Sequence, residues 1–243
     1  MSVDLNRAEI RISVVMLSLT LSAGAIDAIT YLGLGHAFAA LTTGNMLLLG
    51  FGVAQTAGTP IARPAEALAA FAAGVALAHT LIARLDRRGR RWFVAGLAFE
   101  VFLLAAAGLY AVGVAGSGPL AGRGQAVTVV LLAAAMGWRQ RVMLEAGIPD
   151  MPTTVLQMTL VKAVTDVLSG SFPGPAGTRL AKARRIATIV GLFAGGAAGA
   201  LLLRLGPGPA LLCIAGFEAC VAALYAHSPR YRPPTPAAGA TTG

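Results

Sequence analysis

The chain has 243 residues, of which 56% are hydrophobic and 12% are charged, and its mean hydropathy is +0.74. Soluble domains carry roughly 25% charged residues, so this composition excludes a soluble globular protein and indicates an integral membrane protein. The net charge of +9 lies in short stretches between apolar segments, which argues against a nucleic-acid partner and for orientation signals in a bilayer.

Six apolar stretches are long enough to cross a membrane as helices, which requires about 20 residues each. Two further stretches, 36–54 and 153–169, are shorter and more polar. We therefore predict an all-α, polytopic membrane helix bundle of about six spans with two short re-entrant or half-length helices. The six expected spans are residues 14–33, 66–85, 92–114, 124–144, 186–204 and 209–226.

The membrane domain, 14–227, is expected to follow a short N-terminal segment, 1–13, and to precede a disordered tail, 228–243, rich in Pro, Ala, Gly and Thr. A signal peptide is disfavoured, because cleavage would cut into the most distinctive motif of the chain. Ordered matches within the domain predict two repeats, 14–115 and 124–227. The matched pairs are Gly24-x-x-Asp27 with Gly137-x-x-Gln140, Thr42-Thr43 with Thr153-Thr154, Gly74 with Gly196, and Phe99-Glu100 with Phe217-Glu218.

The distribution of Lys and Arg favours one topology. If all eight stretches span the membrane, neither orientation gives a clear bias. If the two polar stretches each enter and leave on one side, 15 basic residues lie on the side of both termini and three lie on the other, namely Arg63, Arg123 and Arg204. This predicts six spans, cytoplasmic termini and a second repeat inverted relative to the first, an arrangement common in secondary transporters.

The candidate site residues are polar groups at membrane depth, where unpaired polar groups are costly. Asp27 is a carboxylate within the first span. In the segment Thr42-Thr43-Gly44-Asn45, Gly44 allows close backbone approach, and Thr or Asn can cap a following half-helix. The free amides of such a helix end favour anions. In the alternative, the threonines bond to their own helix and Asn45 joins two helices.

Glu100 and Glu218 occupy matching places in two spans, nine or ten residues after the start of each. Buried carboxyl groups suit reversible protonation, so both are candidates for proton coupling. In the alternative, each acid packs a helix and pairs with a basic residue. The series Gly191, Gly195 and Gly199 is a small-residue ridge that lets membrane helices approach closely.

Several motifs together resemble the YoaK family of bacterial multi-span membrane proteins. They are Gly24-x-x-Asp27, the run from Tyr31 to His36, the Thr-Gly-Asn turn, Met136-Gly137 and Thr153-Thr154. The resemblance implies about six spans in the bacterial cytoplasmic (inner) membrane. The function of that family is unknown, so the resemblance implies no substrate or cofactor. Its members tend to have Gln-Asn where this chain has Arg139-Gln140.

We predict a small secondary transporter for a small solute, with a mild preference for an anion; a non-transporting scaffold or sensor is the alternative. No catalytic motif, metal-ligand spacing or cofactor fingerprint occurs, so we expect no enzyme, metal or cofactor. The expected partners are the lipid bilayer and the solute, and assembly of identical copies is left open. The predicted solute-binding residues, facing one central cavity, are Asp27, Thr42, Thr43, Gly44, Asn45, Gln140, Thr153 and Thr154.

Overall fold

The computed structural model describes residues 2–54, 61–86, 92–146, 165 and 176–226, and its regular structure there is helical. The elements are α1 (Ser2–Gly33), α2 (Thr42–Val53), α3 (Ala62–Asp86), α4 (Trp92–Ala115), α5 (Gly122–Ala146), α7 (Ala176–Leu202), a 3-10 turn η1 (Leu203–Leu205) and α8 (Pro207–Ala226).

Six of the described helices are long and apolar enough to cross a membrane, which confirms the predicted number of spans. The span that contains Arg139 and Arg141 runs without interruption from Gly122 to Glu145. In contrast, α2 has 12 residues and a length of about 18 Å, well short of the roughly 30 Å of a hydrocarbon core. It is therefore the half-length helix expected within 36–54.

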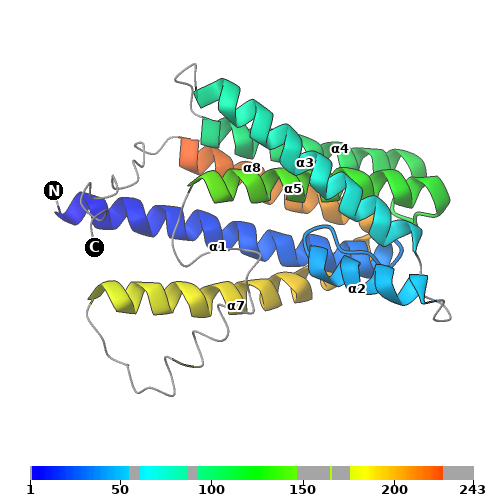
Figure 1. The fold of residues 1–243 in the computed structure, drawn as a ribbon, viewed down its shortest axis with the longest axis horizontal. Helices are drawn as coiled ribbons and strands as arrows, with labels where there is room; N and C mark the ends of the chain where they lie inside the picture. The colour runs from blue at the N-terminus through cyan, green and yellow to red at the C-terminus, as the bar shows by residue number, and fades with distance from the viewer. Residues whose placement is uncertain (1, 55–60, 87–91, 147–164, 166–175, 227–243) are drawn as a thin grey trace, which may run out of the picture.

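The direction of each helix can be followed in Figure 1. The helix α1 ends, and α3 begins, at the end of the bundle where α2 lies. The helix α5 ends, and α7 begins, at the opposite end. The second polar stretch, 153–169, lies outside the described residues apart from Thr165, so its form stays a prediction.

The main helix contacts join spans that are far apart in the chain. The helix α1 packs along α7, α3 packs along α5, and α4 packs along α8. Glycines allow the first of these approaches: a Cβ atom on Gly195 would lie 2.0 Å from the carbonyl oxygen of Leu21, and one on Gly199 would lie 2.3 Å from that of Ala25. The predicted glycine ridge is thus confirmed as a packing surface.

The pair α3 and α5 uses the same device. A Cβ on Gly74 would lie 2.1 Å from the carbonyl oxygen of Ala134, and one on Gly137 would lie 2.0 Å from that of Phe71. In each pair a glycine of one helix rests on the backbone of the other. Any side chain at these positions would force the helices apart.

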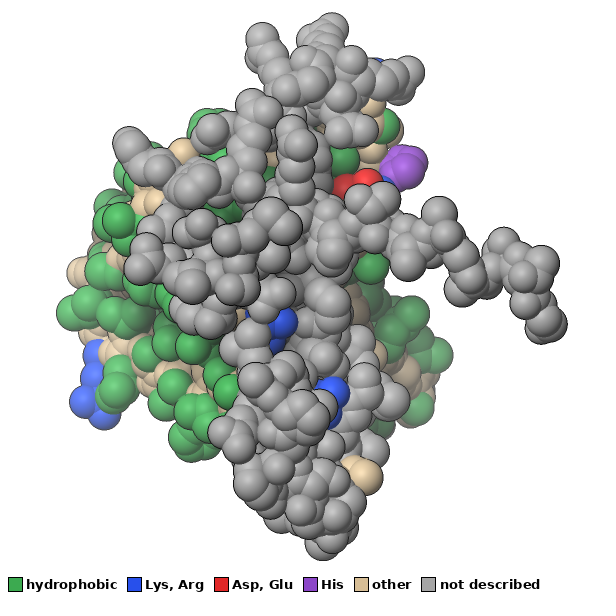
Figure 2. Space-filling view, turned by 90° about the vertical axis from the view of Figure 1, so that its left-hand side faces the viewer, with side chains coloured by type: hydrophobic (Ala, Val, Ile, Leu, Met, Phe, Trp, Pro, Cys, Tyr) green, Lys and Arg blue, Asp and Glu red, His purple; other side chains and the backbone are tan. Residues whose placement is uncertain are grey.

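Apolar side chains fill the centre of the bundle and also cover its flanks. The central cluster includes Ile26, Leu104, Leu132 and Leu211, all fully buried, from α1, α4, α5 and α8. Large apolar side chains such as Phe193 point outward. Figure 2, which views the end where α1 begins, shows hydrophobic side chains along the flanks. An apolar exterior of this kind matches a protein surrounded by lipid.

The glycine contact between α3 and α5 can be tested by adding one methyl group. We expect Gly74→Ala to lower the free energy of unfolding by about 1–3 kcal/mol, because the new Cβ overlaps the backbone of Ala134. Thermal unfolding of the purified protein measures the effect. The control is Gly113→Ala in α4, where a Cβ meets nothing within 4 Å. Equal melting temperatures for the two variants would contradict the close approach.

Candidate functional site

The loop between α1 and α2 is held by two polar side chains. One oxygen of the Asp27 carboxylate accepts the N–H of Ala40 at 2.7 Å, and the other accepts the N–H of Leu41 at 3.1 Å. The side chain of Asn45 accepts the N–H of Phe38 at 2.9 Å and donates to its carbonyl oxygen at 2.7 Å. These bonds satisfy backbone groups of a non-helical segment, which is the condition for irregular backbone at membrane depth.

Asp27 also supplies the negative charge at the start of α2. That helix begins at Thr42, and its N-cap residue is Leu41, whose own side chain makes no capping hydrogen bond. The expectation that Thr42, Thr43 or Asn45 caps the half-helix is therefore wrong. The Asp27 carboxylate bonds to the N-cap amide, so the charge that favours the helix start comes from the protein itself.

Gly44 serves the packing of the same loop. A Cβ at this position would lie 2.8 Å from the ring of Phe38. The Phe38 ring in turn stacks on Tyr31 with centroids 4.7 Å apart, and His36 meets Tyr31 edge-on at 5.3 Å. The first motif is thus a compact unit in which the loop folds back on the end of α1.

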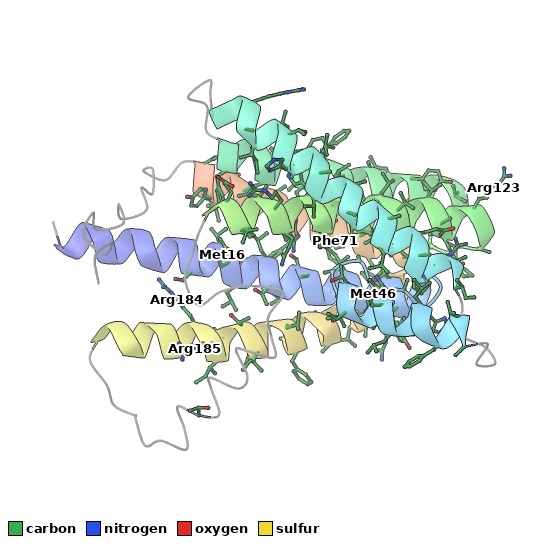
Figure 3. The ribbon with its side chains drawn as sticks, in the orientation of Figure 1. Met16, Met46, Phe71, Arg123, Arg184 and Arg185 are labelled. Carbon is green, nitrogen blue, oxygen red and sulfur yellow. The ribbon has the colours of Figure 1, made fainter. Side chains whose placement is uncertain are left out.

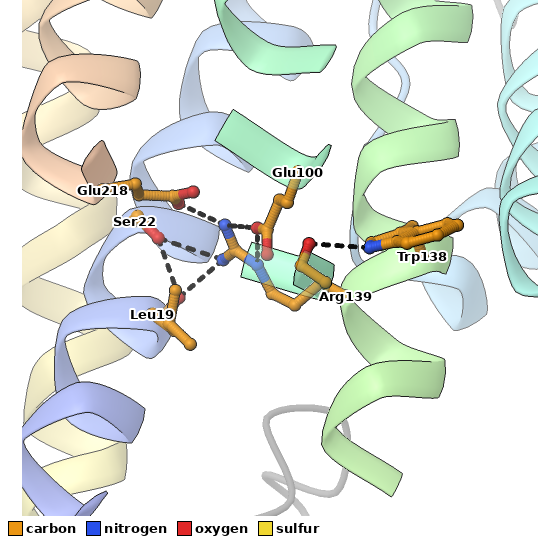
Figure 4. A network of polar contacts seen from close by, with 7 residues as sticks. Leu19, Ser22, Glu100, Trp138, Arg139 and Glu218 are labelled. Carbon is orange, nitrogen blue, oxygen red and sulfur yellow. Dashed lines mark hydrogen bonds and ion pairs between the residues drawn. The ribbon is translucent and has the colours of Figure 1, made fainter. Parts of the chain in front are cut away.

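A buried ion cluster lies deeper in the bundle, as Figure 4 shows. The guanidinium of Arg139 on α5 is 2% exposed and forms ion pairs with Glu100 on α4 and Glu218 on α8, which are equally buried. Its Nε–H donates to Glu100, and its Nη2–H donates to Glu218.

Helix α1 completes this cluster with neutral acceptors. The Nη1 group of Arg139 donates to the carbonyl oxygen of Leu19 at 2.7 Å and to Ser22 Oγ at 3.0 Å. Ser22 Oγ itself donates to the Leu19 carbonyl oxygen at 2.9 Å. Four helices therefore meet on one planar cation, whose donors point toward all of these acceptors.

Aromatic packing beside the cluster fixes α5 against α4. The indole N–H of Trp138 donates to the carbonyl oxygen of Gly96 at 2.8 Å, and its ring packs on Phe99 with centroids 4.3 Å apart. Trp138 precedes Arg139 in the chain and Phe99 precedes Glu100. The aromatic contact and the ion pair therefore support one register between the two helices.

The chain matches the family described as "Protein of unknown function (DUF1275)" over residues 15–224. It belongs to this family. It is also 30% identical over 160 residues to "UPF0700 transmembrane protein YoaK" of Bacillus subtilis (strain 168), a match that covers 63% of this chain and 66% of the relative. The matched part is thus slightly less than two thirds of the relative's length. No solved structure matches the chain.

These matches confirm the resemblance to the YoaK family and, with the six apolar helices, a multi-pass membrane protein. The family description names no function. Among the described residues, no group of three or more His, Cys, Asp or Glu could hold a metal ion.

Sequence reasoning singled out both glutamates but missed the residue that joins them. Glu100 and Glu218, selected because they occupy matching places, meet on one guanidinium. Arg139 falls within the expected span 124–144, but the charge count included it among the 15 basic residues on the side of the termini; that count is wrong for Arg139, since it is buried inside a span. A usable signal was present: two acids in apolar helices need a buried partner, and few basic residues fall inside a span.

The structure describes the positions of some, but not all, of the predicted solute-binding residues. Asp27 and Asn45 act together on one loop, with Thr42 and Thr43 at the start of the following helix. Gln140 is half-buried on α5, and Thr153 and Thr154 lie outside the described residues. The facing arrangement across a central cavity therefore stays a prediction.

Removing the central cation should destabilise the DUF1275 protein strongly. Arg139→Met leaves two buried carboxylates without a counter-charge, so we expect a loss of about 3–5 kcal/mol in the free energy of unfolding. The control is Arg141→Met, two residues along α5, which removes a partly exposed pair with Glu145 at 2.5 Å and should cost at most about 0.5 kcal/mol. Thermal unfolding in detergent compares them. Similar losses in both variants would show that Arg139 is not the central ion.

Proposed function

We propose that the protein is a small, proton-coupled secondary transporter in the bacterial inner membrane, built from two inverted repeats. The observation that carries the proposal is the meeting of Glu100 and Glu218, one from each repeat, on the single buried guanidinium of Arg139. Ionisable groups inside a membrane bundle commonly mark ion pathways, and transporter sites lie where two repeats meet.

Reciprocal glycine contacts support the two repeats. Gly24 lies on the Leu192 carbonyl in the way that Gly137 lies on that of Phe71. The first residues of the two contacts are 113 apart in the chain, and the second residues are 121 apart.

The other two close contacts follow the same rule. Gly74 lies on the carbonyl of Ala134 as Gly195 lies on that of Leu21, with the same two separations of 121 and 113 residues. This register pairs Gly74 with Gly195, one residue away from the sequence match with Gly196. Helices α1 and α5 run in opposite directions, as do α3 and α7, and α4 and α8 (Figure 1), which favours an inverted relation.

The charge of the cluster supports proton coupling. Two carboxylates and one guanidinium sum to one negative charge, and a net charge is costly in a buried site. At the repeat separation of 113 residues, the position that matches Arg139 is Ile26, which is fully buried and apolar. No second guanidinium comes from that position, and a proton taken up by the cluster would neutralise it.

A non-transporting scaffold is the second candidate, and one observation favours it. Both acids of the cluster are paired with Arg139 in a buried site, so the same contacts are sufficient to join four helices without any transport. The two candidates differ in whether water ever reaches the cluster, because a transporter must open its site to each side in turn.

Ser22 is the position at which to test this, since it is 1% exposed and its Oγ contacts Arg139. In a Cys213→Ala, Cys220→Ala background, we expect Ser22→Cys to react with a membrane-impermeant thiol reagent from either face, with the share from each face changing with pH. Right-side-out and inverted vesicles measure the two faces. The control Ser117→Cys, in the exposed turn after α4, should react from one face at every pH. Protection of Ser22→Cys from both faces would favour the scaffold.

The basic residues indicate the orientation. Figure 3 shows Arg123 at the end near α2, and Arg184 and Arg185 toward the other end. We expect the end with Arg184 and Arg185 to face the cytoplasm, since most of the basic residues fall on that side. A reporter fused after Arg88 should therefore read cytoplasmic, and one fused at Ser117 should read external. The opposite pattern would contradict both the orientation and the cytoplasmic termini.

A further inference from the structure

We propose that the solute is a monovalent cation with N–H donors, of the guanidinium or primary ammonium type, that it binds at Glu218, and that it exchanges with one proton held by the Glu100 and Glu218 carboxylate pair. This inference rests on the transporter function proposed above and names its substrate class. It replaces the anion expected from the sequence, since the charge at the start of α2 is supplied by Asp27.

Arg139 contacts the two glutamates unequally, and this asymmetry indicates that Glu218 is the one that binds the cation. Glu100 contacts both the Nε and Nη2 groups of Arg139, whereas Glu218 contacts Nη2 alone. The second carboxylate oxygen of Glu218, Oε2, is buried and has no hydrogen-bond partner among the described residues. An ionised carboxylate accepts about four hydrogen bonds, so Glu218 has acceptor capacity left over, and burying it unused is costly.

The surroundings of this oxygen favour a cation. The groups that meet Arg139 are two carboxylates, the Leu19 carbonyl oxygen and the Ser22 hydroxyl, all of which accept hydrogen bonds from it. An incoming anion would meet two like charges. An N–H cation would make charge-assisted hydrogen bonds to the carboxylate, the same type of bond that Arg139 already makes.

Charge balance makes binding of the proton and binding of the cation mutually exclusive. The cluster lacks one positive charge, and either species supplies it. When the cation binds, the O–H bond of the proton held by the Glu100 and Glu218 pair breaks, the proton leaves to water, and N–H···O hydrogen bonds from the cation to Glu218 form in its place. Arg139 keeps its contacts with Glu100 throughout. One proton is released for each cation bound, which is the stoichiometry of an antiporter.

The test uses Trp138, which packs on Phe99 beside the cluster, as a fluorescent reporter in the full-length Trp92→Phe protein. We expect its emission to change with pH in a single transition. Guanidinium chloride at millimolar concentration should move the midpoint to lower pH, by about one pH unit per tenfold increase in concentration once binding saturates. Sodium chloride at the same concentration should not move it.

Glu218→Gln should abolish both the transition and its displacement. The matched control is Glu66→Gln, which removes a carboxylate from a surface pair with Arg63 and should leave both unchanged. A displacement that persists in Glu218→Gln would overturn the assignment. If Glu218→Gln does not fold, proton release by the unsubstituted protein is measured in weakly buffered solution. We expect about one proton per guanidinium bound. Release of no proton would overturn the exchange.

The results distinguish a wrong cation assignment from a wrong transport function. A pH transition that guanidinium leaves in place, with Ser22→Cys reactive from both faces, would overturn the cation while the proton-coupled transporter stands. No transition together with a protected Ser22→Cys would overturn both.

Discussion

A guanidinium that cannot leave the membrane interior organises this protein. Arg139 carries a full charge in a site that is 98% shielded from solvent, where an unpaired ion is costly. Its hydrogen bonds therefore constrain α1, α4 and α8 to reach it at one depth. The aromatic contact of Trp138 and the surrounding apolar cluster then pack around that fixed point.

The second constraint is the break in helical structure after α1. Backbone groups cannot be left unpaired at membrane depth, and here they are satisfied by Asp27 and Asn45, which flank the loop on its two sides. Both constraints act through α1: Ser22 contacts the ion cluster and Asp27 holds the loop, about 7.5 Å further along the helix axis. A shift of α1 along its axis would disturb both at once.

Sequence reasoning predicted what depends on length and composition. Six spans, the half-length helix, the glycine ridge and the choice of Glu100, Glu218 and Asp27 as candidate residues all follow from apolar runs, small-residue spacing and acids in apolar segments. The role of Arg139 did not follow, because a charge count treats each arginine as a loop residue. The capping of α2 was wrong for a related reason: the group that bonds to its start comes from a position 14 residues earlier, and local spacing does not reveal such a partner.

The glycine contacts bear on how the protein is made. A span that enters the bilayer during synthesis can pack only on spans already present, and α1 finds its main partner in α7, more than 140 residues later. Until α7 is synthesised, the backbone of α1 around Leu21 and Ala25 lacks the glycines of α7 that pack against it. Likewise Arg139 enters the membrane after Glu100 but before Glu218. The final bundle must therefore close late in biosynthesis, and a chain released before α8 would hold the arginine with only one of its two carboxylates.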